Sequence, residues 1–378
     1  MNVAVIHDWF AWYSGAERVV EEILKIYPNA DLYATVDILT EEERKFLNGK
    51  NIYTSNLQKF PFIKKYYKHY IILFPYWVEK FDLSKYDLII SSSSSVAKGV
   101  KCTEDQIHLC YIHTPARYVW DLREQYILET GLNRGLKRKV VDYFLNRFQK
   151  WDLLNTHKVN HFIANSNYVK SRVKRIYGRE STVIYPPVDS DLFKILEKKG
   201  NFYLTASRIV PYKKIDLIVQ AFTKMPDKRL IVIGKGPGLA KLIEVATPNI
   251  QLLGYQPFKV LHDYMRKAKA FIFAAEEDFG IIPVEAQACG TPVIAFKKGG
   301  LLETVLEYKT GLFFKEQTIE SLIKAVEKFE LISQTFNPIS IRENAMRFNS
   351  KRFRNEIENC INQFLNKQNT TITKQKDL

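Results

Sequence analysis

Short apolar runs alternate with amphipathic stretches along most of the chain. The stretches between the runs, such as "ERVVEEILKIY" and "KIDLIVQAF", repeat apolar residues at helical spacing. Continuous apolar strands separated by helices are typical of parallel sheets that are covered on both faces. The pattern therefore predicts an α/β fold with doubly wound sheets. The predicted strands are residues 2–7, 86–92, 108–113, 161–166, 201–207, 229–234, 249–254, 270–275 and 291–296.

The segment "YPPVDSDLF" divides this pattern in two, because Pro186 and Pro187 force extended backbone and a new strand–helix series follows. A chain of 378 residues is also too long for one ordinary core. We therefore predict an N-terminal Rossmann-like domain over residues 1–185 and a C-terminal one over residues 186–350. Residues 351–378 are predicted to form an amphipathic helix that packs back on the N-terminal domain, with a frayed tail beyond Asn366.

Composition narrows the class of protein. The apolar fraction of 46% excludes general disorder, and the densest apolar stretch, "YIILFPYWV", is far shorter than the roughly 20 residues of a membrane-spanning helix. The start, "MNVAVIHDWF", shows no targeting peptide. Four scattered cysteines without a CxxC pair favour reduced thiols over disulfides or zinc. We expect a cytoplasmic protein, at most peripheral on the cytoplasmic face of the inner membrane.

Charge points to an anionic partner. The net charge is +15 and the pI is near 9.4, which leaves nucleic acid, an anionic membrane face and phosphorylated ligands open.

Two carboxylates, Glu277 and Glu285, follow the predicted strand "AFIFAA". If Pro283 takes the first helical position, Glu285 falls in the first helical turn, where the helix dipole favours an acid. Position alone also fits a helix-end stabiliser and a solvated loop acid. In its context, "EEDFGIIPVEAQACGTPVIAFKKGGLLETV", the pair resembles the E-x7-E signature of retaining GT-B glycosyltransferases of family 4.

More narrowly, the run is similar to bacterial mannosyltransferases that use GDP-mannose for O-antigen and other polysaccharides, such as those of lipopolysaccharide. The resemblance covers nearly the whole chain and is weakest between Thr40 and Asp82. It implies the GT-B fold, in which a donor cleft lies between two Rossmann-like domains. It also implies a nucleotide-sugar co-substrate, GDP-mannose, and no separate cofactor.

The same resemblance implies roles for residues of the opening motif. Glu277 would approach the hydroxyls of the donor sugar, beside the backbone N–H groups of Phe279 and Gly280. Glu285 would accept hydrogen bonds from the ribose hydroxyls, because a carboxylate offers two acceptor oxygens.

The segment "SRIVPYKKID" supplies cations just past a predicted strand. By resemblance, Arg208 and Lys213 would hold the diphosphate and stabilise the leaving group as its charge grows, which also removes the usual need for a metal ion. Lys214 could substitute for Lys213. Two ordinary surface cations are the alternative.

Glycines recur at two further strand ends. Gly299 and Gly300 precede a predicted helix, where bare backbone N–H groups could face phosphate, although a plain turn is the alternative. Gly234 lies in "VIGKGPG", which resembles the family's turn beside the nucleotide, but a structural role is favoured for it.

The N-terminal domain would supply the acceptor side. Ser14 and Glu17 form S-x-x-E, a candidate capping box. The family usually shows Gly-Gly before A-E-R, whereas this chain has Ser14 and Gly15, so only Gly15 carries over as a donor-binding residue. Asp8 could meet an acceptor hydroxyl.

The segment "CYIHTPARYVWD" is the most specific N-terminal motif. By resemblance, His113 would touch the reacting sugar, and Arg117, Tyr118 and Asp121 would shape the acceptor side. A core or loop histidine is the alternative. Ser166 is interpreted as a helix N-cap and not as a ligand.

The predicted reaction transfers a sugar from a nucleoside diphosphate to a hydroxyl of a glycan or lipid-diphosphate-linked acceptor, with retention by front-side attack. Alternatives are a UDP-sugar donor and a sugar-nucleotide epimerase of the same fold. A non-catalytic nucleic-acid binder ranks last, because no RNP, KH or helix-turn-helix pattern appears.

Two segments concentrate lysines beside aromatic residues, residues 57–78 and the run "RGLKRKVVDYFLNRFQKW". Such surfaces suit an anionic membrane leaflet, and we hypothesise peripheral docking there. The alternative is two solvated helices with buried aromatic residues.

Overall fold

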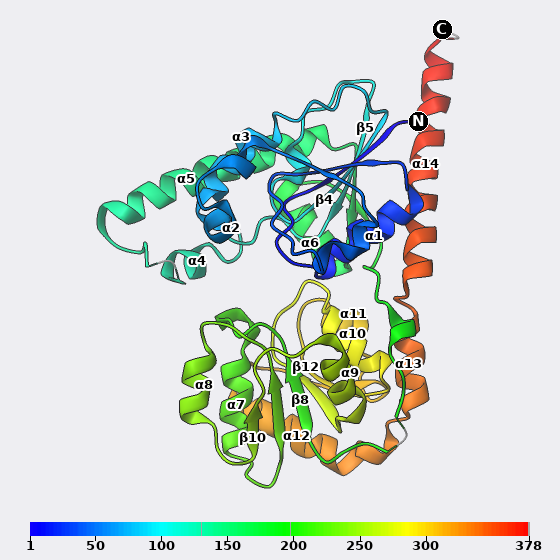
Figure 1. Ribbon diagram of the computed structural model, residues 1–378. Coiled ribbons are helices and arrows are strands. Elements are labelled where there is room, and N and C mark those ends of the chain that lie inside the picture. The colour runs from blue at the N-terminus through cyan, green and yellow to red at the C-terminus, as the bar shows by residue number, and fades with distance from the viewer. Residues whose placement is uncertain (130, 197, 377–378) are drawn as a thin grey trace. The chain divides into compact units, whose positions relative to one another are not determined.

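Figure 1 shows the computed structural model, which describes residues 1–129, 131–196 and 198–376. The chain divides into two compact units. The N-terminal unit consists of Met1–Tyr185 together with Phe353–Leu378, and the C-terminal unit is Pro186–Arg352. The second boundary falls two residues after the predicted position, residue 350.

The N-terminal unit contains a seven-stranded parallel sheet in the order β3-β2-β1-β4-β5-β6-β7. Its strands are β1 (Val3–His7), β2 (Asp31–Ala34), β3 (Ile52–Thr54), β4 (Leu88–Ser93), β5 (Ile107–Ile112), β6 (His161–Ala164) and β7 (Ser181–Val183). Helices cover both faces, so the central strands β1 and β4 are buried along their whole length. The helices are α1 (Gly15–Ile26), α2 (Ile63–Tyr66), α3 (Phe74–Val78), α4 (Arg123–Glu129), α5 (Gly135–Leu154) and α6 (Asn167–Tyr177).

The C-terminal unit contains a six-stranded parallel sheet in the order β10-β9-β8-β11-β12-β13. Its strands are β8 (Tyr203–Ala206), β9 (Leu230–Ile233), β10 (Ile250–Leu252), β11 (Ala270–Phe273), β12 (Val293–Phe296) and β13 (Gly311–Phe314). Its helices are α7 (Ile215–Thr223), α8 (Leu239–Val245), α9 (Phe258–Lys267), α10 (Ile281–Ala288), α11 (Leu301–Thr304), α12 (Ile319–Ile332) and α13 (Pro338–Met346).

The predicted fold class is confirmed, since both units are parallel, doubly wound α/β structures. Every predicted strand corresponds to an observed one. The pattern missed β2, β3, β7 and β13, which are only three or four residues long and lie toward the outer edges of the two sheets. Length alone does not explain these misses, because β10 and β11 are equally short and were predicted.

Both sheets reverse their strand order at one place. In the N-terminal sheet β1 lies between β2 and β4, and in the C-terminal sheet β8 lies between β9 and β11. One part of each sheet is built on one side of this central strand, and the rest of the sheet is built on its other side. At such a reversal a crevice forms beyond the carboxyl ends of the strands, and ligands of such sheets bind there. The loops after β1 and β4, and those after β8 and β11, are therefore the places to look for functional side chains.

The last helix, α14 (Ser350–Lys376), packs on the N-terminal unit (Figure 1, red). Phe353, Ile357 and Ile361 recur at four-residue spacing, are at most 1% exposed, and join the apolar core that contains strand β1. The backbone is helical to Lys376, and the fraying beyond Asn366 stays a prediction. This tail has no Gly or Pro, and polar residues such as Gln and Lys are good helix formers. Its side chains lie outside the described part of the chain.

We expect Ile357→Ala to lower the free energy of unfolding of the N-terminal unit by about 2–5 kcal/mol, because it leaves a cavity under α14. Asn355→Ala, on the exposed side of the same helix, is the matched control and should change stability by less than about 0.5 kcal/mol. Urea unfolding checks both. Equal stability of the two variants would show that α14 contributes no core to this unit.

Candidate functional site

In the C-terminal unit, an ion pair joins the loops that follow β8 and β11. Lys213 ends a 3-10 turn (Pro211–Lys213), and its Nζ lies 2.5 Å from Oε1 of Glu277. Both side chains are largely withdrawn from solvent, at 14% and 18% exposure. The predicted diphosphate lysine and the predicted sugar-side acid therefore neutralise each other at the strand-order reversal.

Arg208 comes from the same loop as Lys213 and has an exposed side chain. Its Nη2 donates a hydrogen bond to the hydroxyl of Tyr212 at 2.9 Å. The ammonium of Lys213 also lies 5.2 Å from the Tyr212 ring centroid. Tyr212 thus links the two cations, a residue that the sequence reasoning missed although "VPYKK" places an aromatic directly beside the lysine.

Two glycines after β12 support the backbone of Glu277. Gly299 pairs with Glu277 in a parallel bridge, and the N–H of Gly300 donates to the Glu277 carbonyl oxygen at 2.8 Å. A Cβ on Gly299 would lie 2.4 Å from that oxygen, and one on Gly300 would lie 2.5 Å from Cα of Phe279. The glycines therefore let the loop that carries the acid lie directly on the start of α11.

Helix α10 begins earlier than the sequence predicted. Gly280 has φ +89°, and this left-handed conformation turns the chain into a helix that starts at Ile281. Pro283 is therefore the third helical residue and not the first, which remains tolerable because the first four N–H groups of a helix lack internal partners. Glu285 is the fifth residue, so the predicted place in the first turn is wrong. Its side chain is buried at 7% exposure.

The neighbouring motif residues have mainly packing roles in this unit. The ring of Phe279 is 3% exposed and packs edge-on against Phe348, with centroids 5.3 Å apart, so only its backbone could face a ligand. A Cβ on Gly234 would lie 1.8 Å from the carbonyl oxygen of Ser207, directly after β8. This close approach agrees with the structural role that the sequence favoured for Gly234.

In the N-terminal unit, Asp8 anchors the loop that follows β4. It is 2% exposed, and its carboxylate accepts hydrogen bonds of 2.6 to 3.2 Å from the backbone or hydroxyl groups of four residues, Ser93, Ser94, Val96 and Ala97. These donors occupy both oxygens. The expected contact with an acceptor hydroxyl would require one of them to be given up.

His113 follows β5 and is half-buried. Its Nε2 lies 2.8 Å from Oγ of Ser92 on the adjacent strand β4. Burial, and to a smaller extent the neighbouring His7, lower the pKa of His113 to about 4. The imidazole is therefore neutral at neutral pH.

Tyr118 and Asp121, two further N-terminal candidates, both contact other residues of the N-terminal unit. Tyr118 shares a hydrogen bond of 2.6 Å with Ser95, and its ring packs on Phe148. Asp121 forms ion pairs with Arg172 at 2.7 Å and Arg175 at 2.8 Å, both on α6. These contacts fix the segment after His113 to the helices around it.

Arg117, in the same segment, is half-buried, and its carbonyl oxygen accepts from the N–H of Leu122 at 2.7 Å. Gly15 is the first residue of α1. The predicted N-cap is confirmed, since Ser166 Oγ accepts from the N–H of Val169 at 3.0 Å.

The structure thus gathers the candidates at one edge of each sheet. In the C-terminal unit, the loops of Arg208, Lys213 and Glu277 meet at the carboxyl ends of β8 and β11. In the N-terminal unit, Asp8 and His113 follow the carboxyl ends of β1 and β5, which lie on either side of β4. Among the described residues, no group of three or more His, Cys, Asp or Glu side chains is arranged to hold a metal ion.

Comparison with known proteins finds a glycosyltransferase family model that matches each unit. Residues 13–192 match the family model described as Glycosyltransferase Family 4, and residues 189–347 match the one described as Glycosyl transferases group 1. The structure is also similar to a crystal structure of Anabaena HepE in complex with UDP and glucose. The TM-score is 0.70 at 17% identity, over 95% of this chain and 99% of that one. This likeness shows the GT-B fold.

Curated relatives match over part of their length. An uncharacterized glycosyltransferase of Methanocaldococcus jannaschii is 30% identical over 221 residues, which are 57% of this chain and 60% of the relative. A GDP-mannose-dependent alpha-(1-6)-phosphatidylinositol monomannoside mannosyltransferase of Mycolicibacterium smegmatis is 28% identical over 192 residues, which are 43% of this chain and 50% of the relative. The chain thus spans 60% or less of the length of these two relatives.

We expect Gly300→Ala to lower the free energy of unfolding by about 1–3 kcal/mol, because the new Cβ meets backbone that has no room to move. Gly238→Ala is the matched control, since both glycines have ordinary helical φ values (−62° and −77°). The nearest atom to a Cβ at 238 is a side-chain methyl of Ile209 at 3.0 Å, and the nearest backbone atom lies at 3.5 Å. Thermal and urea unfolding give the comparison. A Gly300→Ala protein as stable as the control would mean that the Glu277 loop does not depend on this contact.

Proposed function

We propose that this protein, a chain of the group 1 and family 4 glycosyltransferase type with the GT-B fold, transfers a sugar from a nucleoside diphosphate donor to a hydroxyl group. The acceptor would be a glycan or a lipid-diphosphate-linked oligosaccharide. The observation that carries the proposal is the Lys213–Glu277 pair, which joins a cation and an acid from two loops at the strand-order reversal of the C-terminal sheet.

The charges of this site suit a nucleotide sugar. Arg208 and Lys213 would bind the diphosphate and stabilise the negative charge that it gains as the glycosidic bond breaks. The two oxygens of Glu277 can accept hydrogen bonds from neighbouring sugar hydroxyls. The two side chains lie 2.5 Å apart, and a diphosphate would offer Lys213 a second anion. Because two cations already balance the leaving group, we propose a metal-independent reaction.

The proposed reaction retains the anomeric configuration by front-side attack. The bond from the anomeric carbon to the donor phosphate oxygen breaks while the acceptor oxygen bonds to the same carbon. A phosphate oxygen of the leaving group takes the proton of the acceptor hydroxyl. His113 would contact the reacting sugar, and Glu285 the ribose. The similarity of the sequence motifs to retaining enzymes supports this assignment.

For the donor we propose GDP-mannose, supported by the motif resemblance and by the similarity to the GDP-mannose-dependent mannosyltransferase of Mycolicibacterium smegmatis. A UDP-sugar is the second candidate, favoured by the UDP and glucose in the HepE complex. A panel of nucleotide sugars, read by thermal stabilisation and donor hydrolysis, separates them. Conversion of a nucleotide sugar without any acceptor would indicate an epimerase, and salt-sensitive oligonucleotide binding without nucleotide-sugar binding would indicate a nucleic-acid binder.

We expect Arg208→Ala and Lys213→Met each to lower kcat by about 10²–10³-fold, because each removes a charge that stabilises the departing diphosphate. Steady-state kinetics with the preferred donor give the measurement, and circular dichroism checks the fold. Lys214→Met is the matched control for the neighbouring lysine and should keep most of the activity. A greater loss in Lys214→Met than in Lys213→Met would assign the diphosphate to Lys214.

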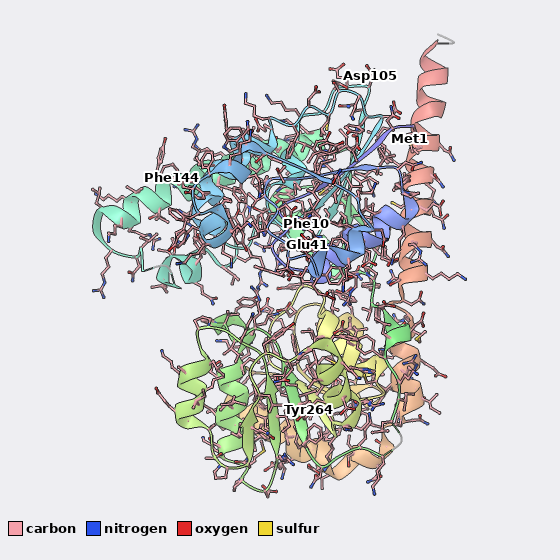
Figure 2. All side chains as sticks on the ribbon, viewed as in Figure 1. Met1, Phe10, Glu41, Asp105, Phe144 and Tyr264 are labelled. Carbon is pink, nitrogen blue, oxygen red and sulfur yellow. The ribbon has the colours of Figure 1, made fainter. Side chains whose placement is uncertain are left out.

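A partner surface is also proposed, on α5 of the N-terminal unit. Leu136, Val140, Tyr143 and Phe144 lie on one face of this helix by their spacing and are 37% to 77% exposed (Phe144 is labelled in Figure 2). Four exposed cations accompany them on the same helix, namely Lys137, Lys139, Arg147 and Lys150.

The other segment rich in lysine and aromatic residues, residues 57–78, folds into short helices and also exposes Phe62, Tyr66 and Tyr76. We propose that these surfaces dock on an anionic membrane at its cytoplasmic face, next to a lipid-linked acceptor. In the described part of the chain, the structure contains no helix that is both long and apolar enough to cross a membrane.

We expect the double variant Leu136→Ser/Tyr143→Ser to sediment with anionic vesicles at least about tenfold more weakly than the parent protein at low salt, because two apolar side chains no longer enter the interface. Ile243→Ser/Leu331→Ser changes two exposed apolar residues of the C-terminal unit and serves as the control. The docking proposal fails if the parent protein does not sediment with phosphatidylserine vesicles, or if both double variants lose binding equally.

A further inference from the structure

A chain of buried polar contacts connects His113 to helix α1. Nε2 of His113 lies 2.8 Å from Oγ of Ser92, and this Oγ lies 3.2 Å from Nδ1 of His7. Nε2 of His7 lies 3.4 Å from Oε1 of Glu17. We call these four residues, Glu17, His7, Ser92 and His113, the relay.

Strand register builds the relay. His7 ends β1 and is the direct neighbour of Ser92 on β4, and β5, which His113 follows, pairs with the other side of β4. Glu17 enters from the first turn of α1, where its second oxygen accepts from the N–H of Ser14 at 3.0 Å and from its Oγ at 2.7 Å. The acid of the predicted capping box therefore also faces His7.

The inner members of the relay are almost fully withdrawn from water, with exposed fractions of 3% for His7, 0% for Ser92 and 5% for Glu17. Polar groups buried to this degree need hydrogen-bond partners, because an unsatisfied one is costly. Each contact of the relay must therefore join one donor to one acceptor, so the direction of one hydrogen bond sets the direction of the next.

The carbonyl of Ser92 decides that direction. It lies 3.2 Å from Nδ1 of His7 and can only accept, as can the carboxylate of Glu17 at the other ring nitrogen. Nδ1 of His7 is therefore the donor, and its Nε2 faces the carboxylate of Glu17 at 3.4 Å. Ser92 Oγ faces the Nδ1–H of His7 and accepts from it. Its own hydrogen is then free to donate to Nε2 of His113.

We infer that Glu17, His7 and Ser92 are positioning residues, which fix His113 as a neutral imidazole with its proton on Nδ1. Among the described residues, no hydrogen bond from the protein reaches Nδ1 of His113, and this atom is not one of the buried polar atoms left without a partner. Nδ1 is thus accessible and presents an N–H donor. Such a donor would bind a hydroxyl oxygen of the donor sugar, a step that rests on the proposed function.

The electrostatic surroundings agree with this arrangement. Burial first, and then the neighbouring His7, lower the pKa of His113, while Asp8 and Glu17 act in the opposite direction. Burial raises the pKa of Glu17, but hydrogen bonds and charge from His7, together with Ser14, outweigh this effect and lower it. A neutral His113 follows from its lowered pKa. His113 then orients the sugar and does not remove a proton from the acceptor.

The opposite direction would have a different chemical meaning. If His7 accepted from Ser92, the proton of His113 would lie on Nε2, and its Nδ1 lone pair could act as a base. That arrangement places the lone pair of His7 Nδ1 against the carbonyl oxygen of Ser92, which is repulsive. The two directions differ in an observable, the protonated nitrogen of His113.

The chain also contains a matched control pair. Ser91, next to Ser92 on β4, makes the same contact with another histidine, His108 Nε2, at 2.8 Å. His108 is 0% exposed, and its Nδ1 is buried without a hydrogen-bond partner. Ser91→Ala therefore removes a serine–histidine bond of equal length that does not belong to the relay.

The experiment is ring ¹⁵N NMR of the full-length protein labelled at its 7 histidines, with signals assigned by His→Gln variants. At pH 7 we expect His113 to carry its proton on Nδ1 alone, and we expect a proton on Nδ1 of His7. Ser92→Ala should shift His113 toward a mixture of tautomers, Ser92→Thr should restore the parent spectrum, and Ser91→Ala should leave His113 unchanged. A proton on Nε2 of His113, or a His113 spectrum unaffected by Ser92→Ala, overturns the inference.

Activity provides the second readout. We expect Ser92→Ala and Glu17→Gln to lower kcat for sugar transfer about tenfold while the KM for the nucleotide sugar changes less, with Ser92→Thr recovering the rate. If Ser92→Ala does not fold, the tautomer of the parent protein and the Ser92→Thr spectrum still decide the question. Because the NMR result needs no substrate, failure of the inference remains distinguishable from failure of the proposed function.

Discussion

In a parallel sheet every strand ends at the same edge, and the side chains that follow the strands are brought together there. The candidate groups of this protein depend on that constraint. Lys213 and Glu277 are 64 residues apart in the chain, yet they pair because β8 and β11 are neighbours at the reversal of strand order. His7 and Ser92 are 85 residues apart and meet for the same reason, across β1 and β4.

The charged groups of the two candidate sites have different kinds of partners. In the C-terminal unit, Lys213 and Glu277 pair with each other at 14% and 18% exposure, and the glycines after β12 hold the acid's backbone in place. In the N-terminal unit, Asp8 is surrounded by donors from the loop after β4, and Glu17 has partners on both oxygens. An unpaired charge at either place would be costly, so the surrounding loops have little freedom to rearrange.

This arrangement changes how several motif residues are interpreted. Asp8, Tyr118 and Asp121 look like free polar groups in a loop-rich sequence, but each has a defined partner that fixes the fold around His113. Glu17 looks like a helix cap and is one, but it also faces His7. Tyr212 stands directly before Lys213 in the sequence and contacts both cations of the C-terminal site. Hydrogen-bond partners, and not residue type, separate the structural from the functional role.

The sequence by itself determined the α/β class, most of the central strands and the motifs that mark the two candidate sites. Those features are local, since apolar runs, helical periodicity and short motifs such as E-x7-E can be read within about thirty residues. Only the tertiary structure decided the short outer strands, the start of α10 at Ile281, the pairing of Lys213 with Glu277 and the relay behind His113. These depend on strand order and on left-handed glycine backbone, and contacts between distant segments leave no periodic trace in the chain.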